Sequence, residues 1–275
     1  MPPIRLERSN LARVFAHRGV AEAYQHRPPH PPEVFSILET LITDSPRDVL
    51  DIGAGEGALA RPLASRVDHV DAVDVSAAMV AAGRDRPGGR RSNLRWVVGA
   101  AETCELGGPY ALVTAGASLH WMTWDSVMTR LITSMTDHAL MAVIDHGPRD
   151  VPWREELVKV IVRHSRSADF DPQVSLVDAL CAEGHFELAG RTETASVRFR
   201  QPVKSYVEQF HSTASLAREL MSREEANDFD AAIERTVRPW VVGGVLEMDV
   251  VATLAWGRPK RRLSDQELEP HRTVP

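Results

Sequence analysis

The chain has 275 residues, of which 43% are hydrophobic and 25% charged, and its formal net charge is −6. This length and composition predict one folded α/β domain with an added cap. The acidic balance disfavours a nucleic-acid partner, and no apolar run is long enough to predict a membrane span. Cys104 and Cys181 lack metal-ligand spacing, so we expect no metal site. The two widely separated cysteines and the lack of an apolar signal-peptide core near residue 1 predict a cytoplasmic protein.

Residues 1–45 predict a helical lead-in that is interrupted by the proline-rich segment 24–32. Proline removes a backbone donor and disfavours the helical conformation of the residue before it. The segment is therefore expected to form a rigid, partly extended loop. Tyr24 and His30 either pack as structural residues or face a pocket, and the sequence leaves both readings open.

The central feature of the sequence is the stretch 48–64, which predicts a strand, a tight turn and a helix. An apolar run at 49–52 is followed by glycines at alternate positions 53, 55 and 57, and leucines then recur at helical spacing. Glycine permits a positive φ and a close approach of the backbone to a ligand. The N-terminus of the following helix favours a negatively charged ligand group.

Strands and helices alternate from residue 47 to 148, which predicts a parallel sheet covered on both faces with ligands at the carboxyl ends of the strands. The expected strands and helices of this half are 49–52, 70–75, 77–82, 94–98, 112–115, 126–135 and 139–146. The second half predicts helices at 153–162, 176–181, 202–221 and 222–237 and strands at 186–200 and 246–256. Ser222 and Glu225 have capping-box spacing at the start of the last helix.

The glycine turn alone fits two kinds of nucleotide site. Gly53, Gly55 and Ala58 satisfy the dinucleotide pattern, and Asp74 follows Gly53 by 21 positions, where a carboxylate meets ribose hydroxyls in either kind. Asp51 and the turn at 99–102 distinguish the two kinds of nucleotide site. With these residues the chain resembles class I S-adenosylmethionine-dependent methyltransferases, whose first motif is D-x-G-x-G-x-G and whose third strand ends in a G-D-A-E-like turn.

Further matches narrow the resemblance to the trans-aconitate methyltransferase-like group of small-molecule enzymes. Tyr24, Arg27, Pro28 and Pro31 match a lead-in pattern of that group, in which His30 replaces an aromatic residue. The resemblance implies a Rossmann-like, seven-stranded, mostly parallel sheet with helices on both faces, and a helical cap inserted between the last two strands. The expected domains are the lead-in 1–45, the cofactor-binding core 46–148 and the remaining sheet 149–257 with its cap at about 201–240. The composition of residues 258–275 predicts a disordered tail.

The resemblance also implies the cofactor, S-adenosyl-L-methionine, with S-adenosyl-L-homocysteine as its product. Asp74 is expected to bind the ribose and Met79 to pack on the adenine, while Ala100 replaces a family aspartate, so Glu102 or backbone atoms take its place. The implied cofactor-binding residues are Asp51, Gly53, Ala54, Gly55, Gly57, Asp74, Val75, Met79, Ala100, Ala101, Glu102, Ala115 and Gly116.

Methyl transfer needs a general base only where the acceptor must lose a proton. His120 and His146 are the candidate bases, because each follows the carboxyl end of a strand and imidazole titrates near neutral pH. Each is equally expected to be a structural residue. Trp121, Tyr24 and His30 are the expected acceptor-binding residues.

The predicted function is methyl transfer to a small-molecule acceptor, with oxygen as the first choice of acceptor atom and natural-product tailoring as one setting. A nicotinamide-dependent oxidoreductase is the first alternative. A protein that binds S-adenosylmethionine without methylating is the second. Monomer and homodimer are both compatible with the sequence.

Overall fold

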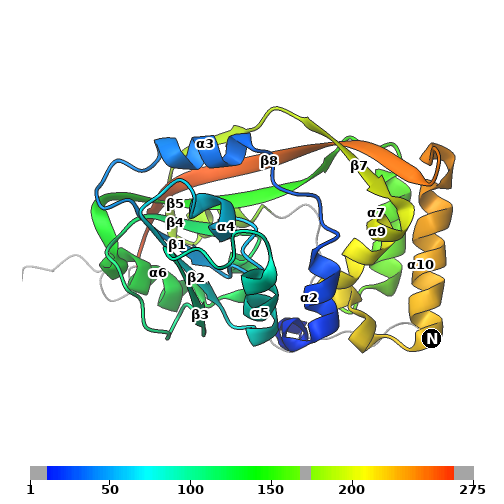
Figure 1. Ribbon diagram of the computed structural model, residues 1–275, viewed down its shortest axis with the longest axis horizontal. Helices are drawn as coiled ribbons and strands as arrows, with labels where there is room; N and C mark the ends of the chain where they lie inside the picture. The colour runs from blue at the N-terminus through cyan, green and yellow to red at the C-terminus, as the bar shows by residue number, and fades with distance from the viewer. Residues whose placement is uncertain (1–10, 168–174, 263–275) are drawn as a thin grey trace, which may run out of the picture.

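The computed structural model describes residues 11–167 and 175–262 (Figure 1). Most of the expected disordered tail, from residue 263, lies outside the described residues. The last strand continues to Pro259 and so includes the first two residues of that tail. Arg258 and Pro259 are therefore part of the sheet.

A single mixed sheet forms the centre of the molecule. Its strands are β1 (Asp48–Ile52), β2 (His69–Asp74), β3 (Leu94–Val98), β4 (Tyr110–Gly116), β5 (Met135–Arg149), β6 (Phe186–Glu193), β7 (Val197–Pro202) and β8 (Val245–Pro259). The order is β3-β2-β1-β4-β5-β8-β6, and β7 also pairs with β8. The first five strands pair in parallel and β8 is antiparallel to its neighbours, which confirms the predicted mixed α/β class.

The sheet has eight strands, and the prediction of seven was wrong because the expected strand 186–200 is two strands. β6 pairs with the end of β8 and β7 with its start, so both share one side of β8. Thr194 lies between them and still bonds to Ala252 of β8: its N–H donates to the Ala252 carbonyl, and its hydroxyl accepts from the Ala252 N–H. The N–H of Ala195 instead donates to the Glu33 carboxylate at 2.7 Å, which interrupts the ladder.

Helices cover both faces of the sheet, as Figure 1 shows for α3 above it and α6 below. The helices are α2 (Arg18–Tyr24), α3 (Glu33–Thr40), α4 (Ala60–Leu63), α5 (Ala77–Asp85), α6 (Trp124–Ser134), α7 (Arg154–His164), α8 (Leu176–Ala182), α9 (Val203–Glu208) and α10 (Arg223–Val237). α3, α4 and α5 share one buried apolar cluster with the sheet, whereas α6 and α8 share another. The carboxyl ends of the parallel strands remain available for a site.

The cap on the long extensions of β5, β7 and β8 is only partly helical. The expected helix 202–221 is wrong beyond Glu208, where three short 3₁₀ segments follow: η3 (Gln209–Ser212), η4 (Ala214–Leu216) and η5 (Arg218–Leu220). α10 matches its prediction, and its capping box forms as expected, since the Ser222 side chain accepts from the Glu225 N–H and the Glu225 side chain from the Ser222 N–H. α7, α9 and α10 bury their apolar residues in one cluster of their own.

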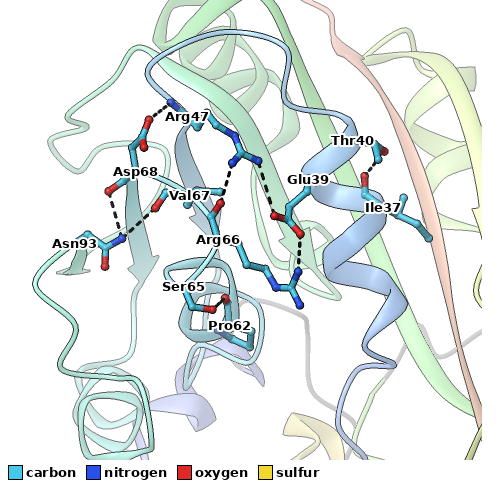
Figure 2. A network of polar contacts seen from close by, with 10 residues as sticks. All are labelled: Ile37, Glu39, Thr40, Arg47, Pro62, Ser65, Arg66, Val67, Asp68 and Asn93. Atoms are coloured by element: carbon cyan, nitrogen blue, oxygen red, sulfur yellow. Dashed lines mark hydrogen bonds and ion pairs between the residues drawn. The ribbon is translucent and has the colours of Figure 1, made fainter.

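Polar contacts hold α3 to the amino ends of the strands (Figure 2). The Arg47 N–H, just before β1, donates to the Asp68 carboxylate at 2.8 Å, and Arg66 pairs with Glu39 of α3 at 2.5 Å. The Asn93 amide donates to three backbone carbonyls of the segment 64–68. This network stabilises the end of the sheet that lies away from the glycine turn.

Candidate functional site

The turn after β1 has the backbone that its glycines allow. Gly53, Gly55 and Gly57 have φ of 63°, 57° and 77°, a region that side chains with a Cβ rarely adopt. A Cβ on Gly53 would lie 2.4 Å from the Cβ of Ser118, in the loop after β4. A Cβ on Gly55 would meet nothing within 4 Å, so Gly55 presents bare backbone to open space.

Two cavities meet at this turn, of about 250 Å³ and about 480 Å³. We call the smaller the nucleoside-side cavity and the larger the reacting-end cavity, after the parts of the cofactor that the sequence resemblance predicts there. Five residues line both: Tyr24, Gly53, Gly55, Gly116 and Ala117. The two cavities therefore form one continuous site along the carboxyl ends of β1, β2 and β4.

The nucleoside-side cavity collects many of the predicted cofactor residues. The predicted cofactor residues that line it are Gly53, Gly55, Asp74, Val75, Met79, Ala100, Ala101, Glu102 and Gly116. Tyr24 and Trp121, which were predicted to bind the acceptor, line it too, and only Tyr24 of these two also lines the reacting-end cavity. Asp74 accepts from the N–H of Gly55 at 2.7 Å and of Ser76 at 2.8 Å, and burial raises the pKa of its carboxyl. Each carboxylate oxygen keeps capacity for a second donor, which suits a pair of ribose hydroxyls.

An aromatic roof covers this cavity. The hydroxyl of Ser76, the N-cap of α5, donates to the Phe15 carbonyl at 2.6 Å and holds η1 (Arg13–Ala16) in place. The Phe15 ring packs edge-on against Trp121 at 5.3 Å and Tyr24 at 6.4 Å between centroids. Sequence reasoning missed Phe15, because a helical apolar residue in the lead-in carries no signal that separates a roof from core packing.

Asp51 gives the reacting-end cavity a buried carboxyl group. Its side chain is 1% exposed, and its Oδ1 accepts from the Thr114 hydroxyl at 2.8 Å. Oδ2 has no hydrogen-bond partner among the described residues, and burial raises the pKa of Asp51 to about 7. A buried carboxyl oxygen without a partner is costly, so a ligand group that donates hydrogen bonds fits there.

His30 and His146 face each other in the same cavity, with ring centroids 3.8 Å apart. His146 Nε2 lies 2.8 Å from the Pro28 carbonyl oxygen. Since a carbonyl can only accept, Nε2 carries the proton, and in the neutral ring Nδ1 has a free lone pair. Burial lowers the pKa of His146 and, together with the His146 charge, lowers that of His30 to about 3, so both rings are neutral near pH 7.

The second candidate base, His120, lies elsewhere. It lines a separate cavity of about 660 Å³ with Asp145 and Arg191, on the opposite face of β5 from His146. Ala117 lines this cavity as well as the other two. Among the parts of the chain that the structure describes, only one of the two predicted bases therefore lines the reacting-end cavity.

Of the remaining predicted residues, Ala54 lines the reacting-end cavity, whereas Gly57 and Ala115 line neither cavity at the turn. A Cβ on Gly57 would lie 2.5 Å from the Trp96 ring, so this glycine permits packing. Sequence reasoning also missed Phe199 of β7 and Arg61 as lining residues. Nothing local in the sequence brings Phe199 to a turn almost 150 positions earlier.

Two absences hold for residues 11–167 and 175–262. No group of three or more His, Cys, Asp or Glu residues is arranged there to hold a metal ion. Within the same ranges no helix combines the length and apolar character that crossing a bilayer requires.

The model of the methyltransferase domain family matches residues 49–139. Uncharacterized methyltransferases of Mycobacterium tuberculosis and Mycobacterium bovis are 30% identical over 111 residues, which is 40% of this chain. The chain spans 55% of the length of these relatives. The stretch matched by the family model includes the glycine turn and Asp74.

Solved structures share the fold at lower identity. A candidate type II methyltransferase from Anaeromyxobacter dehalogenans has a TM-score of 0.59 at 20% identity, covering 84% of this chain and 97% of its own. An S-adenosylmethionine-dependent methyltransferase from Geobacter sulfurreducens, in complex with S-adenosylhomocysteine, has a TM-score of 0.50 at 15% identity, with coverages of 94% and 100%. These likenesses show a common Rossmann-like fold.

Proposed function

From the premise that residues 49–139 form a methyltransferase domain with the class I fold, we propose that this chain is an S-adenosylmethionine-dependent methyltransferase. The observation that carries the proposal is the continuous site over the glycine turn, with Asp74 on its nucleoside side and Asp51 and His146 at its reacting end. The structural relative from Geobacter sulfurreducens, described as bound to S-adenosylhomocysteine, supports the choice of cofactor.

The residues of the site support the proposed cofactor. Gly55 leaves open space where a side chain would stand, and the aromatic roof of Phe15, Tyr24 and Trp121 suits a flat purine. Asp74 is placed to accept from ribose hydroxyls. When bound, S-adenosylmethionine supplies a methyl group that is already activated by the positive charge on sulfur.

We assign the acceptor to the reacting-end cavity and propose a small organic molecule methylated on oxygen. His146 takes the hydroxyl proton at Nδ1 as the oxygen attacks, because Pro28 holds the proton at Nε2 and burial keeps the ring neutral. His120 is set aside as a base, since it lines another cavity. Apolar walls from Phe35, Leu59 and Phe199 complement a carbon skeleton.

Neither alternative gains support from the site or the relatives. An oxidoreductase reading leaves Asp51 and the turn at 99–102 without a role, and the three curated relatives are all named methyltransferases. We further propose a reducing compartment such as the cytoplasm, in agreement with the two free thiols of Cys104 and Cys181.

Thermal unfolding with one nucleotide at a time tests the proposal. At 100 times its Kd a ligand adds about 2.7 kcal/mol, which raises Tm by about 5 to 10 °C in a protein of this size. S-adenosylmethionine and S-adenosylhomocysteine are expected to give this shift, and NADH and NADPH none. A shift with a nicotinamide nucleotide alone would refute the proposal. Transfer of a labelled methyl group to a panel of phenols, alcohols and organic acids then identifies the acceptor.

A further inference from the structure

His30 and His146 present two imidazole rings to the reacting-end cavity. The ring centroids are 3.8 Å apart, and the ring planes make an angle of 39°. His30 lies in the segment 24–32, and the Phe35 ring of α3 packs edge-on against it at 6.5 Å between centroids. His146 comes from β5, so the pair exists only in the folded chain. A ligand in this cavity therefore meets two imidazole rings that are in contact with each other.

The two rings differ in their hydrogen bonds. The Nε2–H of His146 donates to the Pro28 carbonyl, which leaves Nδ1 of His146 with the lone pair that takes the proton of the acceptor. Nδ1 of His30 is buried and has no hydrogen-bond partner among the described residues. Burial and the charge of a protonated His146 lower the pKa of His30 to about 3. His30 therefore stays neutral while His146 accepts a proton.

The unpartnered nitrogen of His30 favours a ligand group that completes its hydrogen bond, because a buried polar atom without a partner is costly. No hydrogen bond to a described residue fixes the tautomer of His30, so Nδ1 either donates or accepts. A hydroxyl group serves both cases, since it can donate and accept. Because the rings of His30 and His146 are in contact, hydroxyls that bond to them lie close together, as they do on adjacent carbon atoms.

The walls of the cavity favour a flat carbon frame for these hydroxyls. The apolar lining residues include Pro28, Pro29, Phe35, Leu59 and Phe199. Aromatic and proline rings present flat apolar surfaces against which an aromatic ring packs well. The volume of about 480 Å³ is within the range of small-molecule sites.

We propose that the acceptor is an aromatic diol with hydroxyls on adjacent carbons, and that His30 binds the hydroxyl beside the one that is methylated. The inference rests on the proposed function and adds to it a substrate class and a specificity-determining residue. The attacking oxygen forms its bond to the methyl carbon as the carbon–sulfur bond breaks, and the electron pair of that bond stays on sulfur. The proton of the attacking hydroxyl passes to Nδ1 of His146. The hydroxyl on His30 keeps its proton and orients the attacking oxygen.

Methylation of catechol, resorcinol and phenol tests the substrate class. Catechol has hydroxyls on adjacent carbons, resorcinol has them one carbon further apart, and phenol has a single hydroxyl. In the unmodified protein kcat/KM for catechol is expected to exceed that for resorcinol and for phenol by about 5- to 150-fold. This is the range that corresponds to leaving one buried hydrogen-bonding group unpaired.

Two variants of His30 test the residue. His30→Phe keeps a flat ring beside His146 without the nitrogen atoms, and it is expected to lower kcat/KM for catechol to about the value for phenol. Phenol, which lacks the second hydroxyl, is expected to lose much less. His30→Gln returns a group that can donate and accept, and it is expected to recover part of the preference for catechol. His17→Phe is the matched control, because His17 is exposed in the lead-in and lines neither cavity, and it should keep the full preference.

Each other outcome contradicts a different step. Equal kcat/KM values for catechol and phenol in the unmodified protein would overturn the inference. An equal fractional loss for both substrates in His30→Phe would overturn it too, since His30 would then support the structure of the site. A protein that binds S-adenosylhomocysteine but methylates none of the three compounds would overturn the substrate class and leave the cofactor assignment standing. Failure to bind S-adenosylhomocysteine would refute the proposed function itself.

Discussion

Replacing Gly55 with valine is the sharpest test of the site at the glycine turn. Gly55 has a φ of 57°, and a Cβ there would point into open space shared by the two cavities. A residue with a Cβ pays about 1–2 kcal/mol in this left-handed conformation, which lowers Tm by about 2 to 8 °C in a chain of this size. The isopropyl group also occupies ligand space.

Two separate effects are thus expected from Gly55→Val. Overpacking a close contact costs about 1–3 kcal/mol, which corresponds to a loss of affinity of about 5- to 150-fold. S-adenosylhomocysteine titration measures this loss, and thermal unfolding without ligand measures the backbone cost. Only the first depends on the position of the residue in the site.

Gly243 offers a matched control for the backbone cost. It lies in the turn before β8 with a φ of 58°, and a Cβ there also meets nothing within 4 Å. It lines neither cavity at the turn. Gly243→Val is expected to lower Tm as much as Gly55→Val while leaving S-adenosylhomocysteine affinity intact. Equal affinities for the two variants would refute our placement of the ligand over the glycine turn.

Three further outcomes are expected. His146→Ala should lower kcat by about 100-fold or more with little change in S-adenosylhomocysteine affinity, and single-turnover kinetics with the identified acceptor measure it; a loss within a few-fold would make His146 structural. Burial raises the pKa of Asp51 to about 7, so the affinity for S-adenosylhomocysteine should rise as pH increases through 7, because the Asp51 carboxylate then pairs with the ammonium group of the ligand. Titrations at pH 6 and 8 measure this rise, and Asp51→Asn should remove it. Asp71 accepts hydrogen bonds from Arg95, Tyr110 and His69, which outweigh its burial and lower its pKa to about 2. The stability that this carboxylate contributes, about 2 kcal/mol, is therefore present above about pH 4 and lost as pH falls through 2. In urea unfolding, Asp71→Asn should lower the free energy of unfolding by about that amount at pH 7, and an equal loss near pH 2 would contradict the assignment.

The sequence by itself determined the features that depend on short stretches of chain. Alternating glycines at 53, 55 and 57 require a tight turn with positive φ, and the structure has it. Apolar runs bounded by turn residues predicted β1 to β5, and the spacing of Ser222 and Glu225 predicted the capping box of α10. These predictions succeeded because backbone conformation and periodicity are set within a few residues.

The tertiary structure decided how distant segments meet. His30 and His146 are 116 positions apart and come together only because the segment 24–32 folds over the turn. His120 instead lines a cavity on the opposite face of the sheet. The expected strand 186–200 is two strands, because the N–H of Ala195 between them donates to Glu33 of α3. The expected helix 202–221 ends at Glu208 and is followed by 3₁₀ segments. Such outcomes depend on packing and hydrogen bonds between remote residues, which local sequence patterns do not encode.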